Sequence, residues 1–102
     1  MQPILKNKLD DLKSICTTFG VIRLYAFGSA ISGKFTPKSD IDFLISFDDK
    51  LTPEEYANNY LALHYQLRDL FKLDVDIVTE RSLKNPYFIQ KLNESKTLIY
   101  EA

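Results

Sequence analysis

The sequence has too few cysteines and histidines to stabilise a small fold through disulfides or a zinc ion. Its 102 residues include one cysteine, one histidine, three glycines, four prolines and no tryptophan. A single thiol cannot form an internal disulfide, and one cysteine with one histidine cannot complete a tetrahedral zinc site. A disulfide scaffold and a zinc module are therefore excluded. Any metal must be held by carboxylates, which favours Mg²⁺ or Mn²⁺.

The sequence also lacks a long apolar run and an excess of either charge. No segment approaches the ~20 apolar residues that span a bilayer, and the first residues, MQPILKNKLDDLK, lack the apolar core of a signal peptide. Thirteen basic and fourteen acidic side chains give a net charge of -1, so nucleic acid is not expected as an obligate partner. We expect a cytoplasmic protein that does not contact membrane.

What the sequence does contain is enough apolar material for one core. Hydrophobic residues make up 45% and charged residues 26% of the chain, which is typical of a globular domain. A chain of this length forms one domain, residues 1–102, and has no room to enclose a large substrate.

Apolar periodicity predicts alternating helices and strands along the whole chain. Helical spacing marks three segments, at about 3–19, 52–71 and 86–95. Runs of strand-forming residues mark four more, at 21–27, 41–47, 75–79 and 97–100. This order indicates an α+β, two-layer domain with a small mixed β-sheet and helices packed on one face. Cys16 and His64 lie on apolar helical stripes, so both are interpreted as structural residues.

Aspartates cluster at the start of the second predicted strand. Asp40 and Asp42 are two residues apart, so their side chains project together, opposite Ile41 and Phe43. Two like charges side by side are unfavourable unless a cation lies between them. Taken alone, the pair could equally face solvent.

The next predicted strand repeats this pattern with Asp76. If the two strands are neighbours, Asp76 joins Asp40 and Asp42, and three carboxylates on one sheet face suit hard cations. Asp74, at the start of its strand, is interpreted as an ordinary surface residue.

A second feature is the step Gly28-Ser29, where the first predicted strand ends. Backbone N–H groups and a following helix N-terminus at such a step can hold phosphate, although Gly-Ser alone is more often an ordinary turn. The spacing makes the combination specific, because ten residues separate Ser29 from Asp40 and Asp42 follows at the same-face position.

In these motifs the sequence resembles the nucleotidyltransferase superfamily of DNA polymerase beta. Two segments are similar to the minimal nucleotidyltransferases (the MNT family), which are single domains of about this length. They are FGSAISGKFTPKSDIDFLISF and the later DVDIVTERSLKNPYFIQKL. The resemblance covers nearly the whole chain. It departs from many relatives at Ser32, where they carry an arginine before the glycine that matches Gly33.

The resemblance implies transfer of a nucleoside monophosphate, AMP from ATP, to a hydroxyl by a two-metal mechanism. It assigns Asp40, Asp42 and Asp76 to two Mg²⁺ ions, with Mn²⁺ as a substitute. It assigns the phosphates to a set of residues around the turn, namely Gly28, Ser29, Gly33, Lys38 and Ser39.

MNT proteins are often paired with HEPN toxins and can act as antitoxins by adenylylating a tyrosine of the toxin. The resemblance therefore implies a protein partner. The oligomeric state is left open, with a homo-oligomer and a hetero-oligomer both compatible with the sequence. Two alternatives remain. The first is an antitoxin that neutralises its partner by binding only, through exposed aromatics such as Tyr56, Tyr65, Tyr87 or Phe88. The second is an aminoglycoside-type nucleotidyltransferase, although such enzymes usually carry an extra helical domain.

Overall fold

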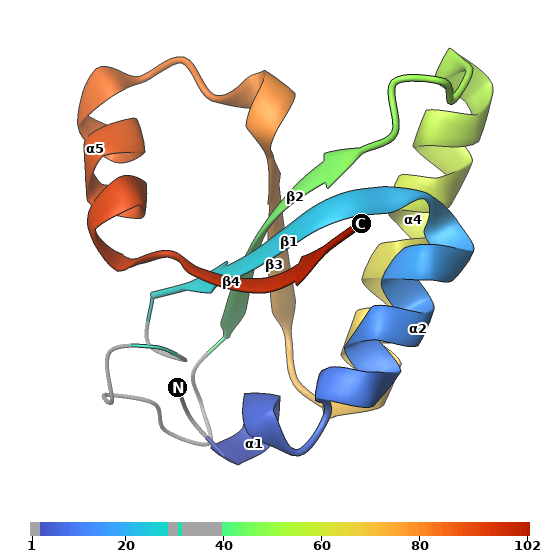
Figure 1. Cartoon of the computed structure of the whole chain (residues 1–102), viewed down its shortest axis with the longest axis horizontal. Coiled ribbons are helices and arrows are strands. Elements are labelled where there is room, and N and C mark those ends of the chain that lie inside the picture. Colours follow the sequence, from blue (N-terminus) through green and yellow to red (C-terminus); the bar gives the residue numbers. More distant parts are fainter. Residues whose placement is uncertain (1–2, 29–30, 32–39) are drawn as a thin grey trace.

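The computed structural model describes residues 3–28, 31 and 40–102, and its centre is a four-stranded mixed sheet in the order β3-β2-β1-β4 (Figure 1). The strands are β1 (Val21–Phe27), β2 (Ile41–Phe47), β3 (Val75–Thr79) and β4 (Thr97–Glu101). β1 pairs antiparallel with β2 and with β4, whereas β2 and β3 are parallel. The α+β class and the mixed sheet are confirmed, and the first three strands have the predicted bounds.

The helices follow the prediction closely, with one difference near the N-terminus. They are α1 (Pro3–Lys6), α2 (Leu9–Phe19), α4 (Pro53–Phe71) and α5 (Pro86–Ser95), and a short 3₁₀ turn η1 (Glu80–Ser82) follows β3. The helix predicted over 3–19 is divided at Asn7 and Lys8. The Lys8 N–H donates to the carbonyl of Leu5 at 3.1 Å, an i→i−3 bond that tightens and ends α1.

The two longer helices begin where their caps predict. Thr52 accepts from the Glu55 N–H at 3.1 Å and the Glu55 carboxylate accepts from the Thr52 N–H at 2.9 Å, which completes a capping box at α4. The Asn85 side chain accepts from two N–H groups of the first turn of α5. No helix in the described part of the chain combines the length and apolar character needed to cross a membrane.

The main core lies between the sheet and α2 with α4. Ile41, Phe43 and Ile45 of β2 are fully buried on this face, as the period-2 pattern requires. Cys16 of α2 belongs to the same cluster, and burial raises the pKa of its thiol to about 12. Its interpretation as a core residue agrees with this environment, because an unreactive thiol is what burial in apolar surroundings produces.

α5 lies on the opposite side of the sheet from α2 and α4 (Figure 1). Its Phe88 ring packs edge-on against Phe27 of β1, and Phe27 is the register partner of Asp42, so this is the aspartate face. The expected arrangement with helices on one face therefore holds for α2 and α4 but not for α5. Leu44, on the same face as Asp42, is fully buried as well, so this face carries apolar surface in addition to the aspartates.

Candidate active site

The parallel pairing of β2 with β3 brings two of the three predicted carboxylates together. Asp42 and Asp76 are direct register partners, so both side chains project from the same face of the sheet. Burial, followed by the negative charges of Asp76 and Asp40 and a hydrogen bond with Asp76, raises the pKa of Asp42 to about 6. A half-buried carboxyl group beside a like charge is disfavoured in its ionised form, which is the physical cause of that shift.

Asp40 lies at the entrance to this pair, directly before β2, and is exposed. Among the described residues, no group of three His, Cys, Asp or Glu side chains is already gathered at metal-binding spacing. Even so, the donor set fits a hard divalent cation, because two adjacent carboxylates with a third nearby offer only oxygen ligands and an unbalanced negative charge.

Gly28 is the other predicted residue that the structure places at this site. It follows β1 with φ of +71°, in the left-handed region that favours glycine. A Cβ atom built at Gly28 would collide with Oδ2 of Asp42 and would lie 3.4 Å from its Cγ atom. Close packing of the turn against Asp42 therefore requires glycine here. The other predicted phosphate-binding residues lie outside the described residues: Ser29, Gly33, Lys38 and Ser39.

A pocket of about 490 Å³ opens beside the two carboxylates, towards β3. Its walls include Phe27 and Phe88 from the aspartate face together with Tyr60 and His64 from α4. The sequence predicts a structural role for His64, and one ring nitrogen has such a role, since Nε2 lies 2.7 Å from the carbonyl oxygen of Val75. Sequence reasoning missed that the ring also lines the pocket.

Tyr60 and His64 together explain how α4 shapes this edge. Tyr60 donates from its hydroxyl to the carbonyl of Ile77 at 3.4 Å, one helical turn from the His64 contact with Val75. The two carbonyls are two residues apart on β3, the edge strand of the sheet, and therefore point the same way. The i, i+4 spacing of Tyr60 and His64, which places both side chains on one face of α4, was the sequence signal that could have predicted this pair of contacts.

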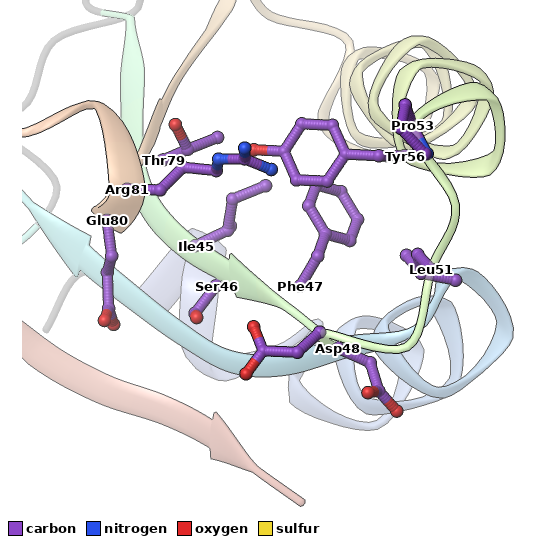
Figure 2. Close-up of a pocket in the computed structure, with 11 residues that line it drawn as sticks. Ile45, Ser46, Phe47, Asp48, Leu51, Pro53, Tyr56, Thr79, Glu80 and Arg81 are labelled. Atoms are coloured by element: carbon purple, nitrogen blue, oxygen red, sulfur yellow. The ribbon is translucent and has the colours of Figure 1, made fainter.

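A second pocket, of about 560 Å³, lies at the other end of β2 and β3 (Figure 2). Two of its charged side chains, Arg81 and Glu80, have partners. The Arg81 guanidinium lies over the Tyr56 ring, 4.7 Å from its centre. Glu80 accepts two hydrogen bonds from Arg23, at 3.1 and 3.2 Å. None of the residues predicted for the active site lines this second pocket.

Comparison with known sequences points to one family. A family model described as a nucleotidyltransferase domain matches residues 9–99. Protein adenylyltransferase MntA of Thermococcus cleftensis is 32% identical over 85 residues, which covers 76% of this chain and 82% of MntA. A presumptive protein adenylyltransferase of Methanocaldococcus jannaschii, MJ1379, is 38% identical over 74 residues, or 72% of this chain and 70% of its own length.

Solved structures with the same fold agree with that match. A presumptive minimal nucleotidyltransferase superposes with a TM-score of 0.70 at 30% identity, over 95% of both chains. A toxin–antitoxin structure with AMP-PNP gives 0.71 at 21% identity, over 92% of this chain and 73% of the other. A complex of a tri-AMPylated Shewanella oneidensis HEPN toxin with an MNT antitoxin gives 0.66 at 18%, over 95% and 72%. At these identities the last two show a likeness of fold alone.

Proposed function

The chain belongs to the nucleotidyltransferase domain family, and from this premise we propose that it transfers AMP from ATP to a tyrosine hydroxyl of a HEPN-type toxin and so acts as an antitoxin. The observation that carries the proposal is the convergence of Asp42, Asp76 and Gly28 at one end of the sheet. Supporting it, MntA is named as a protein adenylyltransferase. A structurally similar MNT antitoxin forms a complex with an AMPylated toxin.

In this proposal each residue has a role set by its chemistry. Asp40, Asp42 and Asp76 hold divalent cations, Mg²⁺ or Mn²⁺, through hard oxygen ligands. When bound, such cations neutralise charge on the attacking and leaving oxygens. The turn at Gly28 and Ser29 holds the β- and γ-phosphates through backbone N–H groups. Gly33, Lys38 and Ser39 complete the phosphate contacts.

The reaction is a balanced group transfer. The acceptor hydroxyl oxygen forms a bond to the α-phosphorus of ATP, and the bond from that phosphorus to the bridging oxygen breaks, releasing pyrophosphate. The hydroxyl proton passes to a base, for which Asp76 is positioned beside Asp42 on the outer strand. Positioning and charge stabilisation supply most of the rate enhancement in transfers of this kind. The supply of ATP and Mg²⁺ that the reaction needs fits a cytoplasmic location.

Labelled-ATP transfer to a purified HEPN toxin tests the proposal. The wild type and an Asp40→Ala, Asp42→Ala double variant are compared with Mg²⁺ present, and circular dichroism confirms that both are folded. We expect label on the toxin only with the wild type. If the wild type transfers no label yet still inhibits the toxin, catalysis is the wrong explanation and an antitoxin that acts by binding alone replaces it.

A further inference from the structure

We propose that the 490 Å³ pocket beside Asp42 and Asp76 is the acceptor subsite, and that Phe88 and Tyr60 select a tyrosyl side chain carried on a polypeptide. The inference rests on the proposed function. It deepens that function by assigning a location and a set of specificity-determining residues to the acceptor.

The order of the strands determines which side the acceptor approaches from. Gly28 ends β1, Asp42 lies on the neighbouring β2, and Asp76 lies on β3 at the edge of the sheet. If phosphates bind at the β1 turn, pyrophosphate leaves on that side. Attacking and leaving oxygens lie roughly in line in phosphoryl-type transfer. The acceptor therefore enters from the β3 side, where the pocket opens.

The lining of the pocket favours an aromatic ring over a polar acceptor. The Tyr60 hydroxyl and Nε2 of His64 already bind the carbonyls of Ile77 and Val75, so neither atom is free for a ligand. Phe27 and Phe88 meet edge to face, with ring centres 6.3 Å apart and planes at 76°. This arrangement leaves ring faces and edges for a third aromatic group, which is the geometry that aromatic contacts prefer.

The charges of the pocket disfavour other acceptors. Asp42 and Asp76 are its acidic residues, and its lining within the described part of the chain includes no lysine or arginine. A nucleic acid strand would find no partner there for its phosphates. The amines of a cationic sugar would compete with the divalent cation for the same two carboxylates. A phenol offers one hydroxyl for the carboxylate end and an apolar ring for the rest.

The surroundings of the pocket indicate that the phenol belongs to a polypeptide. A third pocket, apolar and of about 540 Å³, shares Tyr60 and Ile77 with the acceptor pocket, and its lining includes Leu61 of α4, which is 65% exposed. Because they share these lining residues, the two pockets adjoin, and together they can accept residues that flank a tyrosine. Tyr60 and His64 occupy carbonyls of the β3 edge, so the bound segment contacts side chains and does not add a strand.

Two-dimensional NMR of the isotope-labelled protein with N-acetyl-L-tyrosinamide tests the pocket without requiring catalysis. We expect the tyrosine amide to shift the resonances of Tyr60, Ile77 and Phe88, and N-acetyl-L-serinamide to leave them unchanged. Shifts located elsewhere, equal shifts with both amides, or no shifts would overturn the assignment.

Variants of neighbouring aromatics connect binding with turnover. In Phe88→Ala we expect the Kd for the tyrosine amide and the KM for the tyrosine acceptor to rise about threefold to tenfold, the scale of one aromatic contact, with the KM for ATP unchanged. Phe88→Leu, which keeps apolar contact with Phe27, should show a smaller rise in the same direction. Tyr87→Ala is the matched control, since Tyr87 is 80% exposed and does not line the pocket.

Two further outcomes separate this inference from the function on which it rests. A rise in the KM for ATP in Phe88→Ala, with the acceptor KM unchanged, would assign the pocket to the nucleotide and overturn the inference while transfer itself stands. If the wild type transfers no label but the tyrosine amide still shifts Tyr60 and Phe88, the proposed transfer fails, and the phenol preference of the pocket is supported.

Discussion

The aspartate face of the sheet carries charged side chains at both of its ends, and the two ends differ in how those charges are paired. At one end, Arg23 donates to both carboxylate oxygens of Glu80, at 3.1 and 3.2 Å, and to the Ser46 hydroxyl at 3.2 Å. At the other end, on the same face of β2, Asp42 lies beside Asp76, and the described residues form no ion pair with either. The charges of Arg23 and Glu80 are matched at the first end, whereas those of Asp42 and Asp76 are left unbalanced at the second.

This contrast indicates that the Arg23–Glu80 end stabilises the fold, whereas the Asp42–Asp76 end serves its function. A pairing of like charges costs stability, so a fold keeps it where function requires it. The matched end has the composition of an ordinary structural ion pair. Changing one end at a time therefore tests whether the other end responds.

The largest effect on AMP transfer is expected from a substitution of Asp76, the carboxylate on the edge strand β3. Asp76→Asn should reduce AMP transfer more than about a hundredfold, because even outer-shell changes at metal sites cost about ten- to a hundredfold. The fold should be retained, since Asp76 is exposed and its removal relieves a like-charge contact with Asp42. Single-turnover transfer with labelled ATP measures the rate, and a thermal melt checks the fold.

Asp74→Asn is the matched control on the same segment. The Asp74 side chain is 75% exposed and lies 3.5 Å from the Arg68 guanidinium, and its charge is not among the causes of the raised pKa of Asp42. Transfer should stay within about twofold of the wild type, as for most surface substitutions. Equal losses in the two variants would mean that general charge at this edge matters and that Asp76 has no specific role.

A smaller but still large effect is expected from the turn. Gly20 and Gly28 both have positive φ, at +73° and +71°, so alanine at either should cost about 1–2 kcal/mol of stability. At Gly28 the new methyl group would also collide with Asp42, whereas at Gly20 the nearest atom is 3.5 Å away, on Leu51. The rate of AMP transfer should therefore be about ten- to a hundredfold lower in Gly28→Ala than in Gly20→Ala, because small misplacements of catalytic groups are costly. Similar rates in the two variants would show that the turn does not position Asp42.

Local pattern predicted the elements of this fold better than it predicted their arrangement. The bounds of β1, β2 and β3 follow from short runs of strand formers that end at Gly28, Asp48 and Glu80. The division of the first helix at Asn7 was missed because both of its parts share one apolar stripe. The position of α5 over the aspartate face was missed because it depends on contacts distant in sequence, such as that of Phe88 with Phe27.

The candidate site shows the same limit. The same-face positions of Asp42 and Asp76 could be predicted, but only on the condition that β2 and β3 are neighbours, which no local pattern states. The contact of Gly28 with Asp42 and the bond from His64 to the Val75 carbonyl depend on tertiary packing. A sequence therefore identifies the chemical groups of a site more readily than the walls around them.

At the matched end, a substitution should alter stability and leave catalysis unchanged. Glu80→Gln removes one charge of the Arg23 pair, whose side chains are 34% and 30% exposed. We expect a loss of about 0.5–1 kcal/mol in the free energy of unfolding, the usual value of a partly exposed ion pair. Urea denaturation measures the loss, and labelled-ATP transfer at a temperature where both proteins are folded should be unchanged. A fall in transfer larger than the fall in folded fraction would show that the two ends are coupled.

The last comparison concerns how the stability of the fold depends on pH at the Asp42–Asp76 end. The pKa of Asp42 in the folded protein is raised to about 6, above the value of about 3.9 for an unfolded aspartate. Between these values the unfolded chain releases the proton first, so ionisation of Asp42 destabilises the fold as the pH rises from about 4 to about 6. Asp42→Asn removes this penalty. In EDTA, the variant should therefore gain stability over the wild type through that window, and the gain should level off above it.

Urea midpoints for both proteins at several pH values across this window measure the gain as a difference, which cancels the titration of groups that the two share. Asp74→Asn, which removes a carboxylate outside the pair, should show no such rise with pH. A constant difference between Asp42→Asn and the wild type would mean that Asp42 titrates alike in the folded and unfolded chains. The crowding of carboxylates at this end would then cost the fold nothing, and the contrast with the Arg23–Glu80 end would lose its energetic basis.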